Sequence, residues 1–374
     1  MTTVTAQHLA ANPLATRCYP VRRSVMVGSV QIGGGAPCTI QSMTTPATTD
    51  VGATLEQVER LAEAGCQIVR ISVPDEASCA GFAEVKKRTR VPLVADVHFK
   101  HKMALLAIEA GADKIRLNPG NVTRREHIEE VAKELLRAKI PVRVGSNSGS
   151  IAPRYKTLYE TDPVGAIVGS AKEYVAMLTE FGVEDIVVAL KSHDPMATVE
   201  CYRRFAATEP WPLHIGVTEA GPGITGAARS AVALGILLSE GIGDTMRVSL
   251  ANDPVDEVYV CREILASLNI RPTVRVVACP TCARVEFDLL GLVAKMERSL
   301  LTLDYPISIA IMGCAVNGPG EARDADVGIC AAGGRFMLFK KGQIVRSDLT
   351  PESFPQVLSD EIFEMTGKRI ELEI

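Results

Sequence analysis

The sequence predicts an α/β protein in which a (β/α)₈ TIM-type barrel is followed by a smaller α+β domain. Short β-branched runs alternate with amphipathic helical patterns from Cys38 onward, and eight such runs occur before residue 254. This number of strands and a length near 250 residues are typical of a closed parallel barrel. The alternation then stops, which predicts a barrel domain at 1–268 and a second domain at 269–374. A doubly wound sheet is the alternative, although it usually has fewer strands.

The first predicted element is a small hairpin in 25–35, where apolar residues alternate around Gly28. We expect this hairpin to close the floor of the barrel. The eight barrel strands are predicted at 38–43, 67–73, 92–99, 113–120, 141–149, 185–193, 213–221 and 245–253. Helices are predicted between them, as at 54–66, where Gly65 is a typical helix stop.

The second domain has a different order of elements. A helix is predicted at 283–300, a strand at 306–314, further strands with a glycine turn at 325–346, and a closing helix at 353–367. This pattern predicts a compact α+β unit.

Composition and charge restrict the function. The 374 residues are 47% hydrophobic and 22% charged, and the net charge of −4 argues against a general nucleic-acid binder. No apolar run approaches the roughly 18 residues that span a bilayer, and the first 24 residues contain no secretory signal pattern. We therefore expect a cytoplasmic protein without a membrane partner. Its ten cysteines are better interpreted as thiols or metal ligands than as disulfides.

Polar side chains end the predicted barrel strands. They are Arg70, Asp96, His98, Arg116, Asn118, Arg143, Asn147, Lys191, Glu219, Arg247 and Ser249. Barrel active sites lie at these C-terminal strand ends. Four arginines and a lysine would be costly there without an anionic ligand, and arginine matches phosphate oxygens well. The sequence therefore predicts a phosphate-bearing ligand, whereas ion pairs with Asp96 and Glu219 are the structural alternative.

Three cysteines of the second domain have the spacing of metal ligands. Cys279 and Cys282 form a Cys-x-x-Cys pair, and Cys314 follows. A structural zinc site would need a fourth Cys or His, and no histidine occurs after His214. Cys330 could serve, but it lies in the apolar run "VGIC" and is equally consistent with a buried thiol.

An iron–sulfur cluster uses the same thiolates and accepts a different ligand at one iron. The Gly-Pro-Gly turn of "NGPGE" would let the backbone approach closely and present Glu321. Spacing alone favours a cluster without excluding zinc.

The motifs "CPTC", "GCAVNGPGEARDADVGI", "IQSMT", "VRIS", "DVHF", "IRLNPGN", "VRVGSNSGS" and "KSH" together resemble the 4-hydroxy-3-methylbut-2-en-1-yl diphosphate synthase family of the methylerythritol phosphate route to isoprenoids. The resemblance extends over about 20–370 and is to the compact bacterial two-domain form. It implies an oxidoreductase that opens the ring of 2-C-methyl-D-erythritol 2,4-cyclodiphosphate. Two electrons then remove a hydroxyl group and give 4-hydroxy-3-methylbut-2-en-1-yl diphosphate.

The resemblance also implies a [4Fe–4S] cluster on Cys279, Cys282 and Cys314, with Glu321 as the fourth ligand. A reduced flavodoxin or ferredoxin would supply the electrons. The family precedent further implies a homodimer in which the cluster domain of one chain caps the barrel of its partner.

In the barrel, the resemblance implies that the diphosphate is held by Arg70, Arg116, Arg143, Lys191, Arg247 and Ser249. The reacting carbons would be lined by Asp96, Asn118, Asn147 and Glu219. We expect catalytic roles for Asp96, His98, Glu219 and Glu321. Two positions depart from the family pattern: Thr45 stands where asparagine is expected, and Ala283 where glycine or serine is usual.

Two other functions remain compatible with the residues taken alone. One is an iron–sulfur electron carrier fused to a phosphate-binding barrel, and the other is a zinc-stabilised barrel lyase.

Overall fold

The structure, a computed structural model, describes residues 21–98, 100–285, 287–301, 303, 305–316, 318–370 and 372, without the side chains of 298, 301, 319 and 321. It divides into two compact units, one that ends at Ile270 and one that begins at Arg271. The boundary lies two residues after the one expected from the sequence, 268/269.

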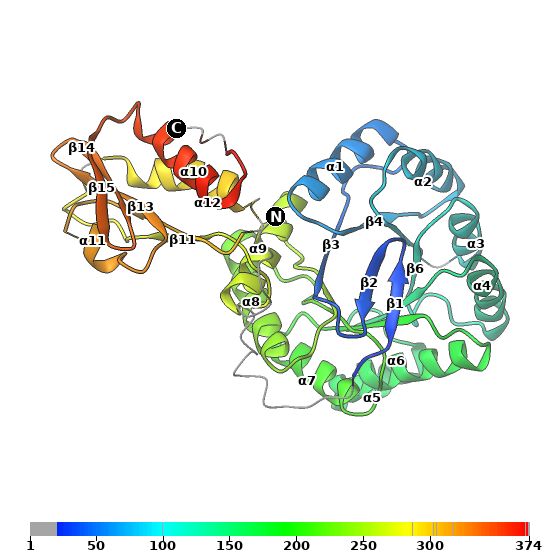
Figure 1. Ribbon diagram of the computed structural model, residues 1–374. Coiled ribbons are helices and arrows are strands. Elements are labelled where there is room, and N and C mark those ends of the chain that lie inside the picture. Colours follow the sequence, from blue (N-terminus) through cyan, green and yellow to red (C-terminus); the bar gives the residue numbers. More distant parts are fainter. Residues whose placement is uncertain are drawn as a thin grey trace. The chain divides into compact units, whose positions relative to one another are not determined.

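The first unit contains the predicted parallel barrel. Its strands are β3 (Thr39–Met43), β4 (Ile68–Ser72), β5 (Leu93–Asp96), β6 (Lys114–Leu117), β7 (Val142–Asn147), β8 (Ile186–Lys191), β9 (His214–Ile215) and β10 (Thr245–Met246). The strands pair in the order β8-β7-β6-β5-β4-β3-β10-β9, and a parallel bridge between Val188 and Leu213 joins the two end strands. The prediction of an eight-stranded barrel is therefore confirmed (Figure 1).

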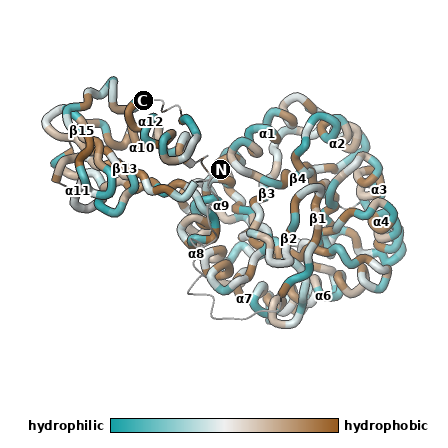
Figure 2. Tube along the Cα trace, in the orientation of Figure 1, coloured by the Kyte–Doolittle hydropathy of each residue, from teal (hydrophilic) through white to brown (hydrophobic). Residues whose placement is uncertain are grey.

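Helices surround this ring of strands (Figure 1). They are α1 (Val51–Glu63), α2 (Glu76–Arg88), α3 (His101–Glu109), α4 (Arg125–Ala138), α5 (Lys156–Thr161), α6 (Pro163–Glu180), α7 (Pro195–Ala206), α8 (Gly223–Ser239) and α9 (Pro254–Ser267), with a 3₁₀ turn η2 (Pro153–Tyr155). Aspartates cap several of them; the Asp50 side chain, for example, accepts a hydrogen bond from the Ala53 amide at the start of α1. The strands are predominantly hydrophobic, whereas the helices carry hydrophilic residues (Figure 2).

A hairpin closes the N-terminal end of the barrel, as predicted. It consists of β1 (Ser24–Val27) and β2 (Val30–Gly33), and Gly28 in its turn has a left-handed φ of +55°. Its apolar side chains pack on those at the beginning of three barrel strands: Val25, Val27 and Ile32 on Ile68, Val94 and Val187. In the part of the chain that the structure describes, ligands can therefore reach the barrel from its other end, where a cavity lies.

The observed strands are shorter than predicted, most clearly at β9 and β10. The predicted run 213–221 retains only His214–Ile215 as strand, and 245–253 retains only Thr245–Met246. Glu219 has a φ of 53°, which is incompatible with an extended chain. The polar segments that follow both strands therefore form loops at the barrel mouth. Residue 99 of the predicted strand 92–99 lies outside the described residues.

The second unit is built on a five-stranded sheet in the order β11-β12-β13-β14-β15. Its elements are β11 (Arg275–Ala278), α10 (Leu289–Leu301), β12 (Ser308–Met312), α11 (Gly318–Glu321), β13 (Val327–Ala332), β14 (Arg335–Lys340), β15 (Gln343–Leu349) and α12 (Phe354–Thr366). The first three strands are parallel and the last three antiparallel. The sequence did not predict β11, because its residues are exposed or half-buried and show no apolar alternation.

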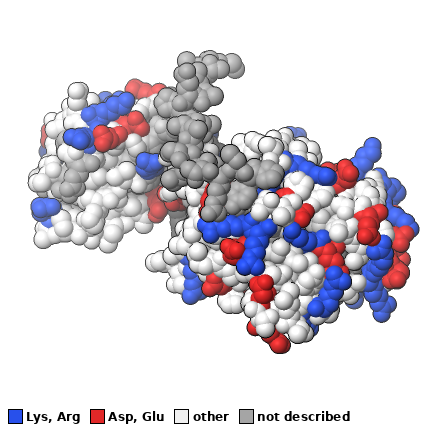
Figure 3. Space-filling model, turned by 90° about the horizontal axis from the view of Figure 1, so that it is seen from below, with Lys and Arg blue, Asp and Glu red and all other residues white. Residues whose placement is uncertain are grey.

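The described helices include none that is long and apolar enough to cross a membrane. On the face shown in Figure 3, basic and acidic side chains are intermixed over the barrel unit, and the described residues there form no broad basic surface.

Candidate active site

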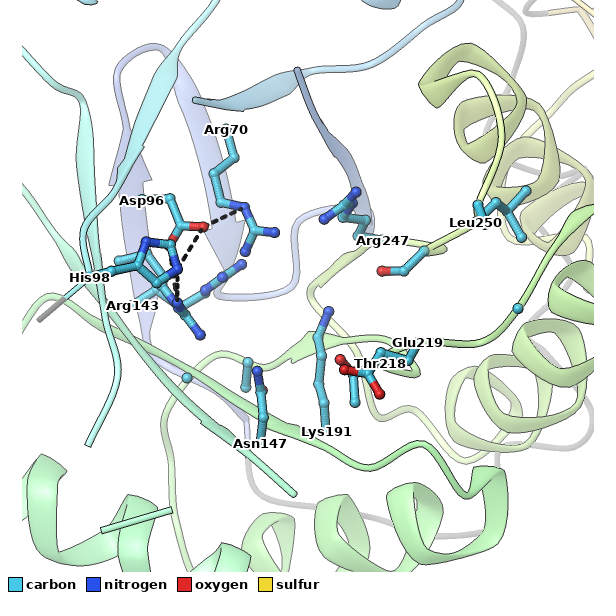
Figure 4. Close-up of a pocket in the computed structure, with 16 residues that line it drawn as sticks. Arg70, Asp96, His98, Arg143, Asn147, Lys191, Thr218, Glu219, Arg247 and Leu250 are labelled. Carbon is cyan, nitrogen blue, oxygen red and sulfur yellow. Dashed lines mark hydrogen bonds and ion pairs between the residues drawn. The ribbon is translucent and has the colours of Figure 1, made fainter. Parts of the chain in front are cut away.

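A cavity of about 550 Å³ lies at the C-terminal ends of the barrel strands. Ten of the residues predicted from the strand ends line it: Arg70, Asp96, His98, Arg116, Arg143, Asn147, Lys191, Glu219, Arg247 and Ser249. Figure 4 shows the long cationic side chains extending from different strands toward the same space. The barrel geometry thus gathers side chains that are far apart in the sequence.

Asp96 orients two of the arginines. Its carboxylate lies 3.6 Å from Nε of Arg70 and 3.1 Å from Nη1 of Arg116, and Nε2 of His98 is 3.9 Å away (Figure 4). Burial alone would raise the pKa of Asp96, but Arg70 and Arg116 hold it below its usual value. Asp96 is therefore an ionised anchor at neutral pH.

Arg247 is held by a residue that the sequence analysis missed. Glu257, buried on α9, accepts hydrogen bonds from Nε and Nη2 of Arg247 at 2.9 and 3.0 Å. Its carboxylate also accepts bonds from the Ser42 hydroxyl at 2.7 Å and the Leu250 amide at 3.1 Å. These four contacts fix both the arginine and the loop beside it.

Met43 also contacts two of the cations. Its sulfur accepts hydrogen bonds from Nε and Nη2 of Arg70 at 3.2 and 3.0 Å, and Nη1 of Arg247 approaches to 3.7 Å. A thioether is a weak acceptor and brings no charge, so it orients the arginines without neutralising them.

Arg143 and Lys191 are basic side chains without a carboxylate partner among the described residues. Arg143 is 2% exposed, and no described residue forms a hydrogen bond with its Nε or Nη1. Nζ of Lys191 has no hydrogen bond or ion pair to any described residue. Burial and the neighbouring arginines lower the pKa of both side chains well below their usual values. Because unpaired buried charge is costly, this arrangement favours binding of an anion.

Two glycines leave room for these side chains. A Cβ atom at Gly145 would lie 3.2 Å from Nε of Arg116, and one at Gly216 would lie 2.6 Å from Nζ of Lys191. Any larger residue at either position would displace a cation. Both glycines lie among apolar barrel residues, and the sequence predicted them only as parts of strands.

Glu219 lies at the rim of the cavity in a loop with unusual backbone geometry. Its φ of 53° is rare for a residue other than glycine, and its side chain is exposed. The preceding residue, Thr218, is held by a bond from its amide to the Ser192 carbonyl at 3.1 Å. Such backbone strain is common at functional sites and keeps the Glu219 carboxylate beside the cavity.

Asn118 is the one predicted barrel residue that the structure does not bring to the cavity wall. It is 1% exposed, its Nδ2 donates to Oγ of Ser150 at 2.6 Å, and its Oδ1 accepts from the Gly120 amide at 2.7 Å. Asn118 therefore connects the loop after β6 to the loop after β7.

Two of the predicted metal ligands follow adjacent strands of the second unit. Cys279 comes directly after β11 and Cys314 after β12, and these strands are parallel neighbours. The Gly313 amide donates to the sulfur of Cys279 at 3.2 Å, which ties the two loops together. Cys282 is exposed in the turn after Cys279. The three thiols therefore come from one edge of the sheet.

The fourth ligand is less fully defined. Glu321 ends α11, and its side chain lies outside the described residues. Cys330 is fully buried in β13, and a Cβ atom at Gly318 would lie only 2.5 Å from its sulfur. Cys330 thus packs beneath α11, consistent with a core thiol. Among the side chains that are described, no three Cys, His, Asp or Glu converge as metal ligands, but soft thiolates suit iron or zinc.

Comparisons with known proteins cover both units. The family model for the GcpE TIM-barrel domain matches residues 22–262, and the model for the GcpE protein C-terminal domain matches 275–364. Three similar proteins are each named 4-hydroxy-3-methylbut-2-en-1-yl diphosphate synthase (flavodoxin). The Geobacillus thermodenitrificans protein is 47% identical over 91% of both chains. The Bacillus subtilis protein is 46% identical over 91% of this chain and 90% of its own. The Geobacter sulfurreducens protein is 47% identical over 87% of this chain and 92% of its own.

Proposed function

This chain belongs to the GcpE family, and from this premise we propose that it catalyses the reaction for which its relatives are named. It is an oxidoreductase that converts 2-C-methyl-D-erythritol 2,4-cyclodiphosphate to 4-hydroxy-3-methylbut-2-en-1-yl diphosphate with two electrons. The observation that carries this proposal is the pair of buried basic side chains Arg143 and Lys191, which line the cavity without a carboxylate partner among the described residues. A cyclic diphosphate supplies the missing negative charge.

The barrel residues bind and orient the diphosphate. Asp96 and Glu257 hold Arg70, Arg116 and Arg247 in place before the ligand arrives, so little side-chain entropy is lost on binding. Nε and Nη1 of Arg143 have no hydrogen-bond partner among the described residues, so they are available for phosphate oxygens, and Lys191 lines the same cavity. Asn147 and Ser249, the other predicted substrate residues, also line the cavity, and Asn118 supports it from the adjacent loop.

Two groups at the cavity are suited to handle protons at the reacting carbons. Glu219 is exposed at the rim, and the His98 side chain is 37% exposed. Both line the cavity, so both can exchange protons with solvent while facing the ligand. Asp96 forms ion pairs with Arg70 and Arg116, and its role is to orient these two arginines.

The chain is an iron–sulfur enzyme by family, and we infer that the centre is a [4Fe–4S] cluster. Cys279, Cys282 and Cys314 would hold it, with Glu321 as the fourth ligand. The three thiols come from the same edge of the sheet, and thiolates are the usual ligands of such a cluster. When bound, the cluster supplies the substrate with electrons one at a time. We expect the reaction in the cytoplasm, because a reducing compartment preserves these thiols.

A flavodoxin is the proposed electron donor, since the relatives are named for it, and a ferredoxin is the alternative. We also infer a homodimer in which one chain's cluster domain caps the barrel of its partner. Exposed apolar side chains on each unit support this: Ile224 at the start of α8 is 90% exposed, and Val316, two residues after Cys314, is 71% exposed. The mass of the particle in solution tests it.

The function is tested with anaerobically purified full-length chain. The expected result is a brown protein that contains iron and sulfide and converts the cyclodiphosphate to the linear diphosphate with reduced flavodoxin. A colourless protein with stoichiometric zinc would support the zinc-stabilised lyase instead. A brown protein that accepts electrons but forms no product would support the electron carrier.

A further inference from the structure

A second polar layer lies inside the barrel beneath the cavity. Gln41 on β3, Lys114 on β6 and His214 on β9 are fully buried. Among the described residues, their side-chain nitrogen and oxygen atoms have no hydrogen-bond partner: both amide atoms of Gln41, Nζ of Lys114 and both ring nitrogens of His214. Buried polar groups nearly always have partners, so this layer calls for an explanation.

Strand alternation shows that Lys114 faces the barrel interior. Ile115 packs in the layer between strands and helices, whereas Lys114 and Arg116 lie on the opposite face of β6. Arg116 lines the cavity, and two residues of strand place Lys114 about 7 Å deeper. Its register partner Val94 packs on the hairpin that closes the floor. Lys114 therefore lies between the hairpin and the cavity.

The charged groups around Lys114 are mostly cations. Those that line the cavity are Arg70 on β4, Asp96 on β5 and His98 after it, Arg116 on β6, Arg143 on β7, Lys191 on β8, Glu219 after β9 and Arg247 near β10. His214 is buried on β9. The Asp96 carboxylate already pairs with Arg70 and Arg116, and the buried Glu257 pairs with Arg247. The hairpin side chains that pack on the barrel strands are the apolar Val25, Val27 and Ile32.

This environment disfavours a charged lysine in the empty barrel. Burial, followed by Arg143 and Arg70, lowers the pKa of Lys114 well below its ordinary value. Burial, Lys191, Arg143 and Lys114 likewise lower the pKa of His214, which remains neutral. A diphosphate in the cavity would reverse the local potential and favour a proton on the amine.

We propose that Lys114 is an additional residue of the anion site, which is uncharged in the empty barrel and takes one proton from solvent when a diphosphate group binds above it. Nζ gains the proton, and no bond of the ligand is formed or broken. The carbonyl of Gln41 and a ring nitrogen of His214 are the unpaired acceptors for the N–H groups so formed. This inference rests on the proposed function in one respect, that the cavity takes a diphosphate.

Calorimetric titration of the full chain with inorganic pyrophosphate tests the proposal. Titrations at one pH in buffers of different ionisation enthalpy give the number of protons taken up on binding. Lys114→Met should take up about one proton fewer than the wild type and bind pyrophosphate about tenfold more weakly. Protonation of pyrophosphate itself is common to both proteins and cancels in this difference. Lys102→Met, at an exposed position on α3, is the control and should match the wild type.

Thermal unfolding without ligand separates this role from a structural one. Replacing an unpaired buried amine by an apolar side chain should raise the melting temperature of Lys114→Met while pyrophosphate affinity falls. Lys114→Gln should show the same loss of proton uptake if the methionine variant does not fold. In the wild type, pyrophosphate affinity should also increase as the pH falls through the titration of Lys114.

An equal proton count in the Lys114 variants and the wild type would overturn the proposal, whatever the change in affinity. Turnover of the cyclodiphosphate by the same preparations identifies which idea has failed. Product formation with an unchanged proton count removes only the role of Lys114. A protein that neither forms product nor binds pyrophosphate removes the proposed function and this inference with it.

Discussion

The barrel unit and the C-terminal unit prepare their candidate sites in different ways. In the barrel, a closed ring of strands buries cations that are already oriented by Asp96 and Glu257. In the C-terminal unit, the thiols of Cys279, Cys282 and Cys314 lie on loops at the edge of an open sheet, and Cys282 is exposed.

The difference shows where the free energy of ligand binding comes from. The barrel keeps unpaired charge buried, so a bound anion relieves an existing electrostatic cost. Metal ligands on loops typically reach their final geometry only when the metal binds, because metal binding and ordering of the loops are coupled. The two sites should therefore respond independently to substitution.

The largest effect is expected at the cysteines. Cys279→Ser, Cys282→Ser or Cys314→Ser should each abolish iron loading, because a hydroxyl is a poor ligand for a soft metal site. Cys330→Ser is the matched control and should retain most of its iron, since that sulfur packs beneath Gly318. Iron and sulfide analysis of the purified variants makes the measurement. Complete loss of iron from the Cys330 variant would contradict the ligand assignment.

Substitution of Glu321 should affect iron retention less than substitution of the three ligand cysteines and more than substitution of Cys330. Glu321→Gln should still assemble a centre on three thiolates, although one that loses iron faster than the wild type on exposure to a chelator. All four thiol variants and Glu321→Gln should bind pyrophosphate with wild-type affinity, because the anion site belongs to the other unit. A parallel loss of anion binding would show that the two sites are not independent.

The next effect in size concerns Arg143. Arg143→Ala should weaken binding of pyrophosphate by about 2–4 kcal/mol, or roughly 30- to 700-fold, because it removes a buried charge-assisted contact. Its iron content should be unchanged. Arg137→Ala, an exposed position on α4, is the control. Wild-type affinity in the Arg143 variant would argue directly against the diphosphate site.

A smaller effect is expected from Glu257. Glu257→Gln leaves Arg247 without its carboxylate partner and should lower the free energy of unfolding by about 1–3 kcal/mol. Pyrophosphate then replaces the missing negative charge, so it should raise the melting temperature of this variant more than that of the wild type. Glu263→Gln, exposed on the same helix, should behave as the wild type. An equal ligand-induced shift in both variants would mean that Arg247 does not contact the anion.

The buried lysines should be visible in the pH dependence of stability. Burial lowers the pKa of Lys191 in the folded barrel below its ordinary value of 10.5, so the unfolded chain binds more protons between the two values. Stability of the ligand-free protein therefore rises with pH in that window, by about 1.4 kcal/mol per pH unit for each such group. Lys191→Met should remove one such contribution from the slope of urea-unfolding free energy against pH, whereas Lys102→Met should not. An unchanged slope would show that Lys191 is charged in the empty barrel.

The sequence predicted most of the polar residues that line the cavity, because two simple rules apply to them. Alternating apolar runs locate parallel strands, and polar residues at their ends share one edge of a barrel. Arg70, Arg143 and Lys191 were found in this way without knowledge of any contact. The same rule placed Asn118 with them, but its amide is bonded to Ser150 and Gly120 instead. Side-chain direction at a strand end depends on the loop that follows, which periodicity does not encode.

Residues that act through a partner were not predictable. Glu257 lies on α9, far along the chain from Ser42, and an acidic residue in a first helical turn is ordinarily explained by the helix dipole. Met43 is ordinary as an apolar strand residue, and only the fold places its sulfur between Arg70 and Arg247. The edge strand β11 was missed because a half-exposed strand lacks the apolar alternation on which the prediction depends.

The smallest effects are expected from substitution of one glycine in each unit, which compares the two units directly. An added methyl group at Gly145 would lie 3.2 Å from Nε of Arg116, close enough to shift the guanidinium by a few tenths of an ångström without backbone strain. Gly145→Ala should therefore cost about 1 kcal/mol, or roughly fivefold in pyrophosphate affinity, with iron content unchanged. Gly149→Ala, which has open space around its Cβ position, is the control.

Gly318→Ala is the counterpart in the C-terminal unit. Its methyl group would lie 2.5 Å from the sulfur of Cys330 and must displace α11, the helix that ends at Glu321. This variant should release iron to a chelator faster than the wild type and bind pyrophosphate normally. Gly145→Ala should thus lower anion affinity and leave iron retention unchanged, whereas Gly318→Ala should do the reverse. If Gly145→Ala also lost iron, or Gly318→Ala also lost affinity, ordering of one site would depend on the other, and independent preparation of the two sites would have to be abandoned.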